Sequence, residues 1–346
     1  MSTRVARRAV VAAIALVAGG APLAGQGLFR SDEPLAITIT TNLRSLVRER
    51  DSLKLERWGA VATVTGGTTT PQTIPVTLRA RGHYRRQARN CDFPPVRLDA
   101  GKGVARGTIL QGNTRLKVTT TCRPGSPEYA QYILAEYAVY RAWALLDPLH
   151  FRTRLARITW TDSLGRMAPV TSWAFLIEDA EEVADRRGYG VEESQGALFD
   201  DVEATSMRRT ALFEWLIGNV DWSVSAQHNI GLFRDSTLAI RAAPYDFDFS
   251  GAVATRYATP DPRLRITSVT DRLHRGPCLT PEAWAPVVAH VLSKRAAIDS
   301  MYASIPDLDP AYLARIRAFW TRGWRTLEDP KAFRSAVIGE CQAKGN

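Results

Sequence analysis

The sequence predicts an α+β protein whose N-terminal part is mostly sheet and whose C-terminal part is mostly helix. Up to about residue 121, apolar residues alternate with polar ones, as in "LAITITTNLRSLV" and "TIPVTLRARG", and this alternation is typical of strands. Beyond Asp179 the apolar residues recur at helical spacing, as in "TSMRRTALFEWLIGN". We therefore expect a β-rich region over residues 35–178 and a helical region over residues 179–346.

The individual elements follow in a definite order along the chain. Ser126, a capping residue, and Pro127 begin the periodic run "SPEYAQYILAEYAVYRAWALL", which predicts a helix over residues 127–146. Two strand-like runs, "RLARITWTD" and "SWAFLIED", come next. In the helical region we expect a hairpin where "NIGLF" and "LAIRA" flank the turn-forming "RDST". This is the element order of a two-lobed protein-kinase-like fold, with a β-rich N-lobe carrying one main helix and a mostly helical C-lobe.

The N-terminus resembles an export signal. Arg4, Arg7 and Arg8 precede the apolar run "AVVAAIALVAGGAPLAG", and small residues follow up to Gln26. Because the run is short and broken by Gly and Pro, a cleaved signal peptide over residues 1–26 is favoured over a membrane anchor. We expect an exported protein, periplasmic or extracellular, with no stable membrane anchor after cleavage.

Charge and cysteine content limit the partners. The net charge of +10 suits anionic partners such as phosphates, but no long block of like charge indicates nucleic acid. The four cysteines are an even number, as expected in an oxidising compartment, and they allow three connectivities. Proximity favours Cys91 with Cys122 and Cys278 with Cys341. Their spacing includes no C-x-x-C, so a zinc site is not expected.

Acids and an amide stand at both ends of the predicted hairpin. If its strands pair, Asn229 at one open end lies near Asp246 at the other, and amide and carboxylate oxygens are the ligands that Mg²⁺ accepts. Asp221 precedes the hairpin and could accept a proton from an incoming hydroxyl. An acid, a downstream Asn, a hairpin and a second acid form the arrangement used in phosphoryl transfer. Taken singly, each acid would be read as a turn or cap residue, and His228 as a structural hydrogen-bonding group.

At this point the motifs resemble those of the spore-coat CotH kinase-like family. The run "GNVDWSVSAQHNIGLF…APYDFDFSG" is similar to that family's D…N run, strand pair and D-x-D element followed by Gly. "RARGHYRRQ", "RLKVTT", "ILAEYAVYRAW" and "AFLIED" fit the family's order, so the similarity covers roughly residues 75–260. The sequence departs from the pattern where Tyr245 replaces a tryptophan, and Asp221 and Asn229 are further apart than in ordinary protein kinases.

The resemblance implies a function and a site. It implies an exported CotH-like atypical kinase that transfers a phosphoryl group from ATP or another nucleotide to Ser or Thr hydroxyls of proteins, with Mg²⁺ or Mn²⁺. By position, Asp221 is the catalytic acid. The implied metal ligands are Asn229, Asp246 and Asp248.

Three further residues are expected to bind the cofactor. By position, Lys117 holds the α and β phosphates and Glu136 on the following helix pairs with it, although an exposed strand lysine and a solvated helix glutamate would fit the same positions. Arg81 lies in an arginine-rich run beside Gly82, where backbone amides and guanidinium groups can form a phosphate cradle. A solvated basic turn is the alternative for that run.

Two other classes of function compete with the kinase. Free ATP is scarce outside the cytoplasm, which favours a catalytically silent, kinase-shaped binding or structural protein of the cell envelope. A metal-dependent hydrolase would use similar carboxylates, but the sequence has no His pair or multi-Asp cluster at hydrolase spacing. Nucleotide binding measured with and without Mg²⁺ separates these classes best.

Overall fold

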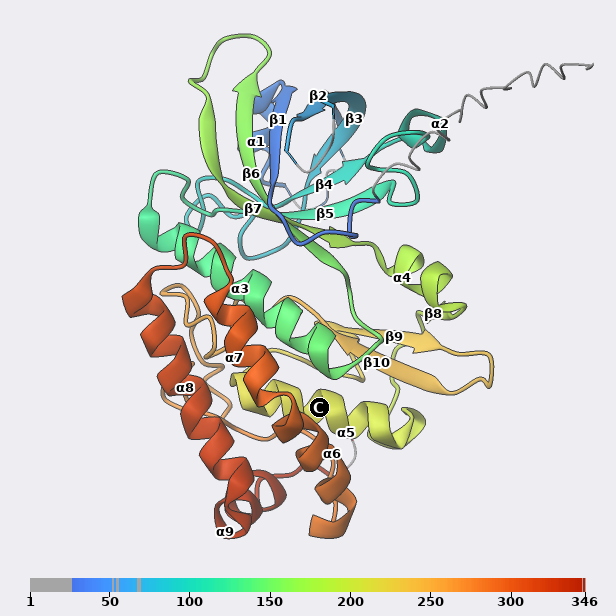
Figure 1. Cartoon of the computed structure of the whole chain (residues 1–346), viewed down its shortest axis with the longest axis vertical. Coiled ribbons are helices and arrows are strands. Elements are labelled where there is room, and N and C mark those ends of the chain that lie inside the picture. The colour runs from blue at the N-terminus through green and yellow to red at the C-terminus, as the bar shows by residue number, and fades with distance from the viewer. Residues whose placement is uncertain (1–26, 52, 54–55, 67–69, 344, 346) are drawn as a thin grey trace, which may run out of the picture.

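The structure is a computed structural model, and it describes the chain except for residues 1–26, 52, 54–55, 67–69, 344 and 346. The predicted signal peptide, residues 1–26, lies outside the described residues. Two regions follow one another along the described chain, a β-barrel and a mostly helical region (Figure 1). The change occurs where the last barrel strand ends at Glu178 and a helix begins at Ala180.

Seven strands close into a barrel in the order β1-β2-β3-β4-β5-β7-β6. Their bounds are Leu35–Thr41 (β1), Trp58–Val64 (β2), Gln72–Ala80 (β3), Val96–Asp99 (β4), Arg115–Thr120 (β5), Thr153–Asp162 (β6) and Val170–Glu178 (β7). Alternate residues point into the barrel, because a strand turns successive side chains to opposite faces. Ile39, Leu98, Leu116 and Trp160 are among the buried residues of this first core.

The predicted two-lobed protein-kinase-like fold is wrong, because the strands form a closed barrel and the chain has a barrel-containing fold. Closure depends on β1, which pairs antiparallel with β2 on one edge and parallel with β6 on the other, where Ile39 lies opposite Trp160. Alternation along a strand shows that one of its faces is buried, but it carries no information about which strands are its neighbours. The parallel partner of β1 comes from the far end of the β-rich segment, so local patterns could not reveal the closure.

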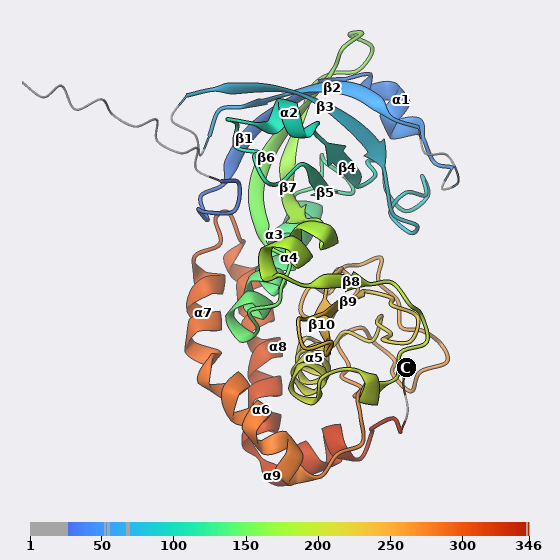
Figure 2. The same cartoon turned by 90° about the vertical axis from the view of Figure 1, so that its right-hand side faces the viewer.

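The helix predicted over residues 127–146 is confirmed as α3, Pro127–Leu146. It contacts β6 and β7 of the barrel and also α5 and α7 of the helical region. Figures 1 and 2 accordingly show α3 between these two parts of the molecule. Tyr140 and Trp143 of α3 belong to the second core, which the helical region shares. Two short helices accompany the barrel, α1 (Leu43–Arg48) and α2 (Lys102–Ala105).

The helical region contains the remaining helices and a small sheet. The helices are α4 (Ala180–Arg187), α5 (Ala204–Ile217), α6 (Pro281–Ser293), α7 (Arg295–Ala303), α8 (Pro310–Glu328) and α9 (Pro330–Phe333), with the 3₁₀ turn η1 (Phe199–Asp201) and the π-helical turn η2 (Arg334–Ile338). The sheet has the order β10-β9-β8 and consists of β8 (Gly190–Glu192), β9 (Ile230–Arg234) and β10 (Ile240–Pro244). The predicted hairpin is therefore confirmed, with Ile230 opposite Pro244 at its open end.

Both disulfides favoured by proximity are confirmed, Cys91 with Cys122 and Cys278 with Cys341. No cysteine is left as a free thiol among the described residues. Two disulfides fit a protein that folds in an oxidising compartment. Within the described part of the chain, no helix has the length and apolar character needed to cross a membrane.

Candidate functional site

The loop after β3 carries an arginine into the space between the barrel and the helical region. Gly82 has a φ of +85°, a conformation that favours glycine, and it turns the chain at the start of this loop. Arg85, three residues on, is buried. Tyr84 beside it contacts the helical region, where its hydroxyl donates to the carbonyl oxygen of Tyr257 at 3.0 Å.

Arg85 is surrounded by three carboxylates, those of Glu136, Asp246 and Asp248. Its nitrogens lie 3.6 Å from an oxygen of Glu136, 3.6 Å from one of Asp246 and 3.3 Å from one of Asp248. Burial alone would lower the pKa of Arg85, but the charges of Asp248 and Glu136 outweigh it and raise that pKa above its usual value. Arg85 is therefore charged, and it holds the three acids together.

Glu136, Asp246 and Asp248 form an acidic triad, in which one oxygen of each lies within 4.8 Å of the others. Glu136 comes from the middle of α3, whereas Asp246 and Asp248 directly follow β10. Burial raises the pKa of Glu136, and the nearby charges of Asp248 and Asp246 add to that effect. Burial likewise raises the pKa of Asp248 to about 6. Arg85 alone therefore does not offset burial and mutual repulsion in the acidic triad, and its acids tend to retain protons.

The backbone and two tyrosines set the positions of the two aspartates. Asp246 has a φ of +62°, an unusual conformation for a residue other than glycine, and its N–H donates to the hydroxyl of Tyr140 at 2.9 Å. Tyr257 donates a hydrogen bond of 3.0 Å to Oδ2 of Asp248. The side chain of Asp246 remains 37% exposed, while that of Asp248 is 6% exposed. Asp246 is therefore the member of the acidic triad that a ligand from solvent can reach.

Asp221 lies close to His228 and Asn229, which precede β9 at the open end of the hairpin. Nε2 of His228 is 2.9 Å from Oδ1 of Asp221, and this hydrogen bond raises the pKa of His228. The side-chain amide of Asn229 donates to the backbone oxygen of Asp221 at 2.7 Å and to its Oδ2 at 3.2 Å. Both neighbours thus fix the orientation of a carboxylate whose side chain is 42% exposed.

Asp221 and His228 line a pocket of about 410 Å³, together with Trp222, Pro260 and Arg275. Electrostatics link this pocket to the acidic triad. The charge of Asp221 contributes to the raised pKa of Asp248, after the larger effects of burial, Arg85 and Asp246. The two carboxylates are therefore within electrostatic reach of one another, with the pocket on the Asp221 side.

Lys117 on β5 faces the same region from the barrel. Its Nζ lies 4.7 Å from the ring centroid of Tyr245, the residue before Asp246, and 5.5 Å from that of Phe151. Burial and, to a smaller extent, the nearby charge of Arg81 lower the pKa of Lys117 to about 8, against the opposing charges of Asp179 and Asp246. Lys117 thus presents a desolvated amine beside Asp246.

The structure changes one expected pairing. Glu136 does not pair with Lys117 but with Arg85, and Lys117 lies against aromatic rings instead. Arg81 follows β3, and its charge acts on both Lys117 and Glu136. The side-chain nitrogen of Asn229, predicted as a metal ligand, is directed to Asp221.

Sequence reasoning missed the central role of Arg85 and the contribution of Tyr257. Arg85 belongs to the arginine-rich run that suggested a phosphate cradle, but a run of arginines in a loop has no periodicity that distinguishes the buried one from the solvated ones. Tyr257 lies in an irregular segment after the D-x-D element. Only the folded chain shows that its hydroxyl donates to Asp248.

The acidic triad has the donor atoms that a divalent cation needs. Carboxylate oxygens are preferred by hard cations such as Mg²⁺ and Mn²⁺. Oε1 of Glu136 is buried and has no hydrogen-bond partner among the described residues. Arg85 is the one cation paired with these three acids among the described residues, so a divalent cation bound here would take the place of the protons that the raised pKa values retain. These residues therefore fit such an ion, with Asp246 as the accessible ligand.

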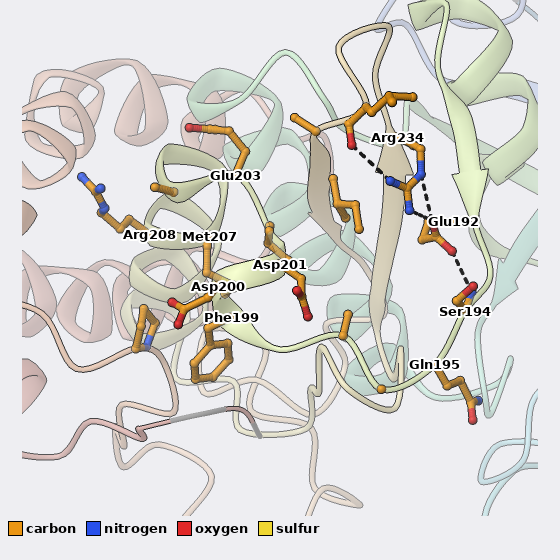
Figure 3. A pocket seen from close by; sticks show the side chains of 18 of the residues that line it. Glu192, Ser194, Gln195, Phe199, Asp200, Asp201, Glu203, Met207, Arg208 and Arg234 are labelled. Carbon is orange, nitrogen blue, oxygen red and sulfur yellow. Dashed lines mark hydrogen bonds and ion pairs between the residues drawn. The ribbon is translucent and has the colours of Figure 1, made fainter.

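A second pocket of about 770 Å³ lies between the start of α5 and the sheet β10-β9-β8 (Figure 3). Phe199 and Met207 contribute apolar lining, and Arg234 donates to Glu192 at 3.0 Å on its other side. The described residues that line this pocket include none of the predicted site residues. It is therefore separate from the acidic triad.

Comparisons of the chain with protein-family models, with curated proteins and with solved structures found no match. The similarity to the CotH kinase-like family consequently rests on the quoted motifs alone.

Proposed function

We propose that this chain is an exported phosphotransferase, periplasmic or extracellular, that moves a phosphoryl group from ATP or another nucleotide to Ser or Thr hydroxyls of proteins. One observation carries the proposal: Asp221, the acidic triad and Lys117 face one region from four separate segments of the chain. The roles are those that the CotH resemblance implies, apart from the two-lobed fold, which the closed barrel excludes.

Asp246 and Asp248 are the residues that would hold Mg²⁺ or Mn²⁺, with Glu136 behind them. Such an ion, when bound, neutralises negative charge on phosphate oxygens. Lys117 adds a positive charge on the barrel side of Asp246. Because Lys117 is buried and rests against Tyr245, its amine is held in place before any phosphate arrives.

Asp221 would accept the proton of the attacking hydroxyl. Its carboxylate lines the 410 Å³ pocket, is oriented by His228 and Asn229, and is accessible to solvent. A general base must lie within hydrogen-bonding reach of the proton that it removes, and an acceptor side chain in this pocket would meet that condition. The two disulfides support export, since both would be reduced in most cytosols.

The second candidate function is a catalytically silent binding or structural protein of the cell envelope. One observation favours it specifically. Arg85 already occupies the centre of the acidic triad, where it supplies positive charge that a cation would otherwise provide.

Nucleotide binding and phosphoryl transfer to a generic protein acceptor test the two proposals together. We expect the parent to bind ATP more tightly with Mg²⁺ than with EDTA, and Asp246→Asn to lose that difference. Asp221→Asn should keep Mg²⁺-dependent binding but lose about 10²- to 10⁴-fold in transfer rate, the usual contribution of a general base. Asp200→Asn, an exposed residue of the second pocket, makes the same charge change and should behave like the parent.

The outcomes separate the candidates. Mg²⁺-dependent binding without transfer by the parent would favour the silent protein. If Asp246→Asn and Asp221→Asn both bind and transfer like the parent, the phosphotransferase proposal is wrong.

A further inference from the structure

The outer face of the barrel carries a row of positive charges that runs across three strands. Arg79 on β3 lies opposite Arg97 on β4, and Arg97 lies opposite Lys117 on β5. Their chain neighbours, such as Leu78, Leu98 and Leu116, belong to the barrel core. Because side chains alternate along a strand, Arg79, Arg97 and Lys117 share the outward face. Neighbouring strands lie about 4.8 Å apart, so the charges recur at a similar spacing.

A pocket of about 1080 Å³ opens over Arg79 and Arg97, and Lys117 follows them in the row beyond the pocket lining. Thr77 and Arg79 of β3, Arg97 and Asp99 of β4, Arg115 of β5 and residues of α2 and α4 line it. Six of the lining residues are cationic, against three carboxylates. The cationic residues are Arg57, Arg79, Arg97, Lys102, Arg106 and Arg115. This excess of positive charge indicates an anionic ligand.

Only some of these cationic side chains form ion pairs with acids of the protein. Arg97 pairs with Asp99 and Asp179 at 3.1 and 2.9 Å, and Arg115 pairs with Asp179 at 3.3 Å. Arg79 forms no ion pair within the described part of the chain, and its buried Nε has no hydrogen-bond partner there. Burial, with the nearby charges of Arg97 and Arg57, lowers the pKa of Arg79. The charge of Asp99 opposes this effect only in part, so an anionic ligand would supply the partner that Arg79 lacks among the described residues.

Two of the three carboxylates in this pocket, Glu182 and Asp99, offset less charge than their number suggests. Glu182 accepts from the backbone N–H groups of Thr114 and Arg115, at 2.6 and 3.1 Å. Burial raises the pKa of Glu182 to about 7, so near neutral pH a large fraction of it is uncharged. Asp99 already forms ion pairs with Arg97 and Arg57.

The lining also argues against recognition of a nucleobase. None of the described residues that line the pocket is aromatic, and they offer no stacking surface for a purine. Guanidinium groups instead match phosphate oxygens in both charge and geometry. A linear ligand with repeated negative charges would follow the row from Arg79 past Arg97 to Lys117, whose amine lies beside Tyr245 and Asp246.

We propose that this pocket binds a linear phosphoanhydride chain, either a free oligophosphate or the triphosphate tail of a nucleotide. The chain lies along Arg79 and Arg97, with its end directed toward Lys117, the next cation of the row. Its use as a phosphoryl donor rests on the proposed function, whereas its binding in the pocket does not.

Calorimetric titration with inorganic tripolyphosphate in the presence of EDTA tests the proposal apart from any cation. We expect the parent to bind tripolyphosphate and ATP with similar affinity and not to bind adenosine. Arg79→Gln and, separately, Lys102→Gln should each weaken tripolyphosphate binding, by about tenfold for Arg79, because a charge-assisted bond to phosphate is lost. Arg265→Gln removes the same charge from a side chain that is 86% exposed and should change nothing.

Three results would overturn the proposal. The first is that the folded parent does not bind tripolyphosphate, and the second is that Arg79→Gln and Arg265→Gln change its affinity equally. The third is that the parent binds adenosine as tightly as ATP but binds tripolyphosphate more weakly than either. Lys102 is exposed, so its variant should fold even if Arg79→Gln does not. Asp200→Asn, in the separate pocket beside α5, should bind tripolyphosphate in EDTA like the parent. A protein that binds tripolyphosphate in this way but never transfers phosphoryl groups would refute the proposed function and leave this inference standing.

Discussion

At the scale of single residues, Arg85 and the three carboxylates around it form the centre of the candidate site. A buried arginine between acids is a costly arrangement unless every partner is present, because removal of one partner leaves uncompensated charge. In this protein three acids share one arginine, and Glu136 has an oxygen with no hydrogen-bond partner among the described residues. The crowding of three acids around one arginine therefore lowers stability, and it also favours the binding of a cation.

Arg85→Met tests this at a single position. Without divalent cations we expect a loss of about 3–5 kcal/mol in the free energy of unfolding, the usual effect of breaking a buried ion pair. Mg²⁺ should stabilise Arg85→Met more than it stabilises the parent, because the ion replaces the missing charge. Urea unfolding with EDTA and with Mg²⁺ measures both quantities.

Arg265→Met is the matched control, since Arg265 pairs with Glu340 on the surface. Exposed ion pairs contribute about 0–1 kcal/mol, so this variant should unfold nearly like the parent. If Mg²⁺ stabilises the parent and Arg85→Met equally, the acidic triad is not the cation site.

At the scale of elements, the loop that carries Arg85 is held at its far end by a disulfide. Cys91 ends the loop and is joined to Cys122, which lies between β5 and α3. The loop therefore has fixed attachments on both sides, at β3 and at the start of the segment that leads to Glu136. Tyr84 adds contacts to Phe249 and Tyr257, with ring centroids 5.3 and 5.7 Å apart.

Removal of this disulfide should therefore affect the site more than the fold. We expect the double variant Cys91→Ala/Cys122→Ala to lose Mg²⁺-dependent nucleotide binding, because the Arg85 loop is released. The accompanying loss of stability should be about 2–4 kcal/mol at most. Nucleotide titration and urea unfolding of the same sample measure both effects.

The second disulfide provides a stringent control. Cys278 and Cys341 are separated by 63 residues, against 31 for the first pair, so the chain-entropy model assigns them the larger contribution to stability. Cys278→Ala/Cys341→Ala should thus unfold more easily but bind nucleotide like the parent. If this variant loses binding as completely as the first, the effect is one of stability and the role assigned to the loop is wrong.

At the scale of the whole molecule, the sequence could predict what depends on neighbouring residues. Ser126 and Pro127 mark the start of α3, and the turn "RDST" marks the hairpin, because capping and turn preferences act over a few residues. The closed barrel could not be predicted, because it depends on the parallel pairing of β1 with β6. The pairing of Glu136 with Arg85 could not be predicted either, because it depends on how the loop after β3 folds back onto α3.

The candidate site joins the two parts of the molecule. Lys117 and Arg85 come from the barrel side, Glu136 comes from the helix between the two parts, and Asp221 and Asp246 come from the helical region. A cation bound by the acidic triad would therefore lie where these parts meet. Figure 2 shows α3 passing through this junction.

Anomalous diffraction from crystals soaked with Mn²⁺ locates the ion itself and therefore decides whether the acidic triad binds a divalent cation. We predict a peak between the carboxylates of Asp246 and Asp248 in the parent, no such peak in Asp246→Asn, and an unchanged peak in Asp200→Asn. A parent crystal with Mn²⁺ bound at other acids and none at Asp246 and Asp248, or a peak that persists in Asp246→Asn, would contradict the account.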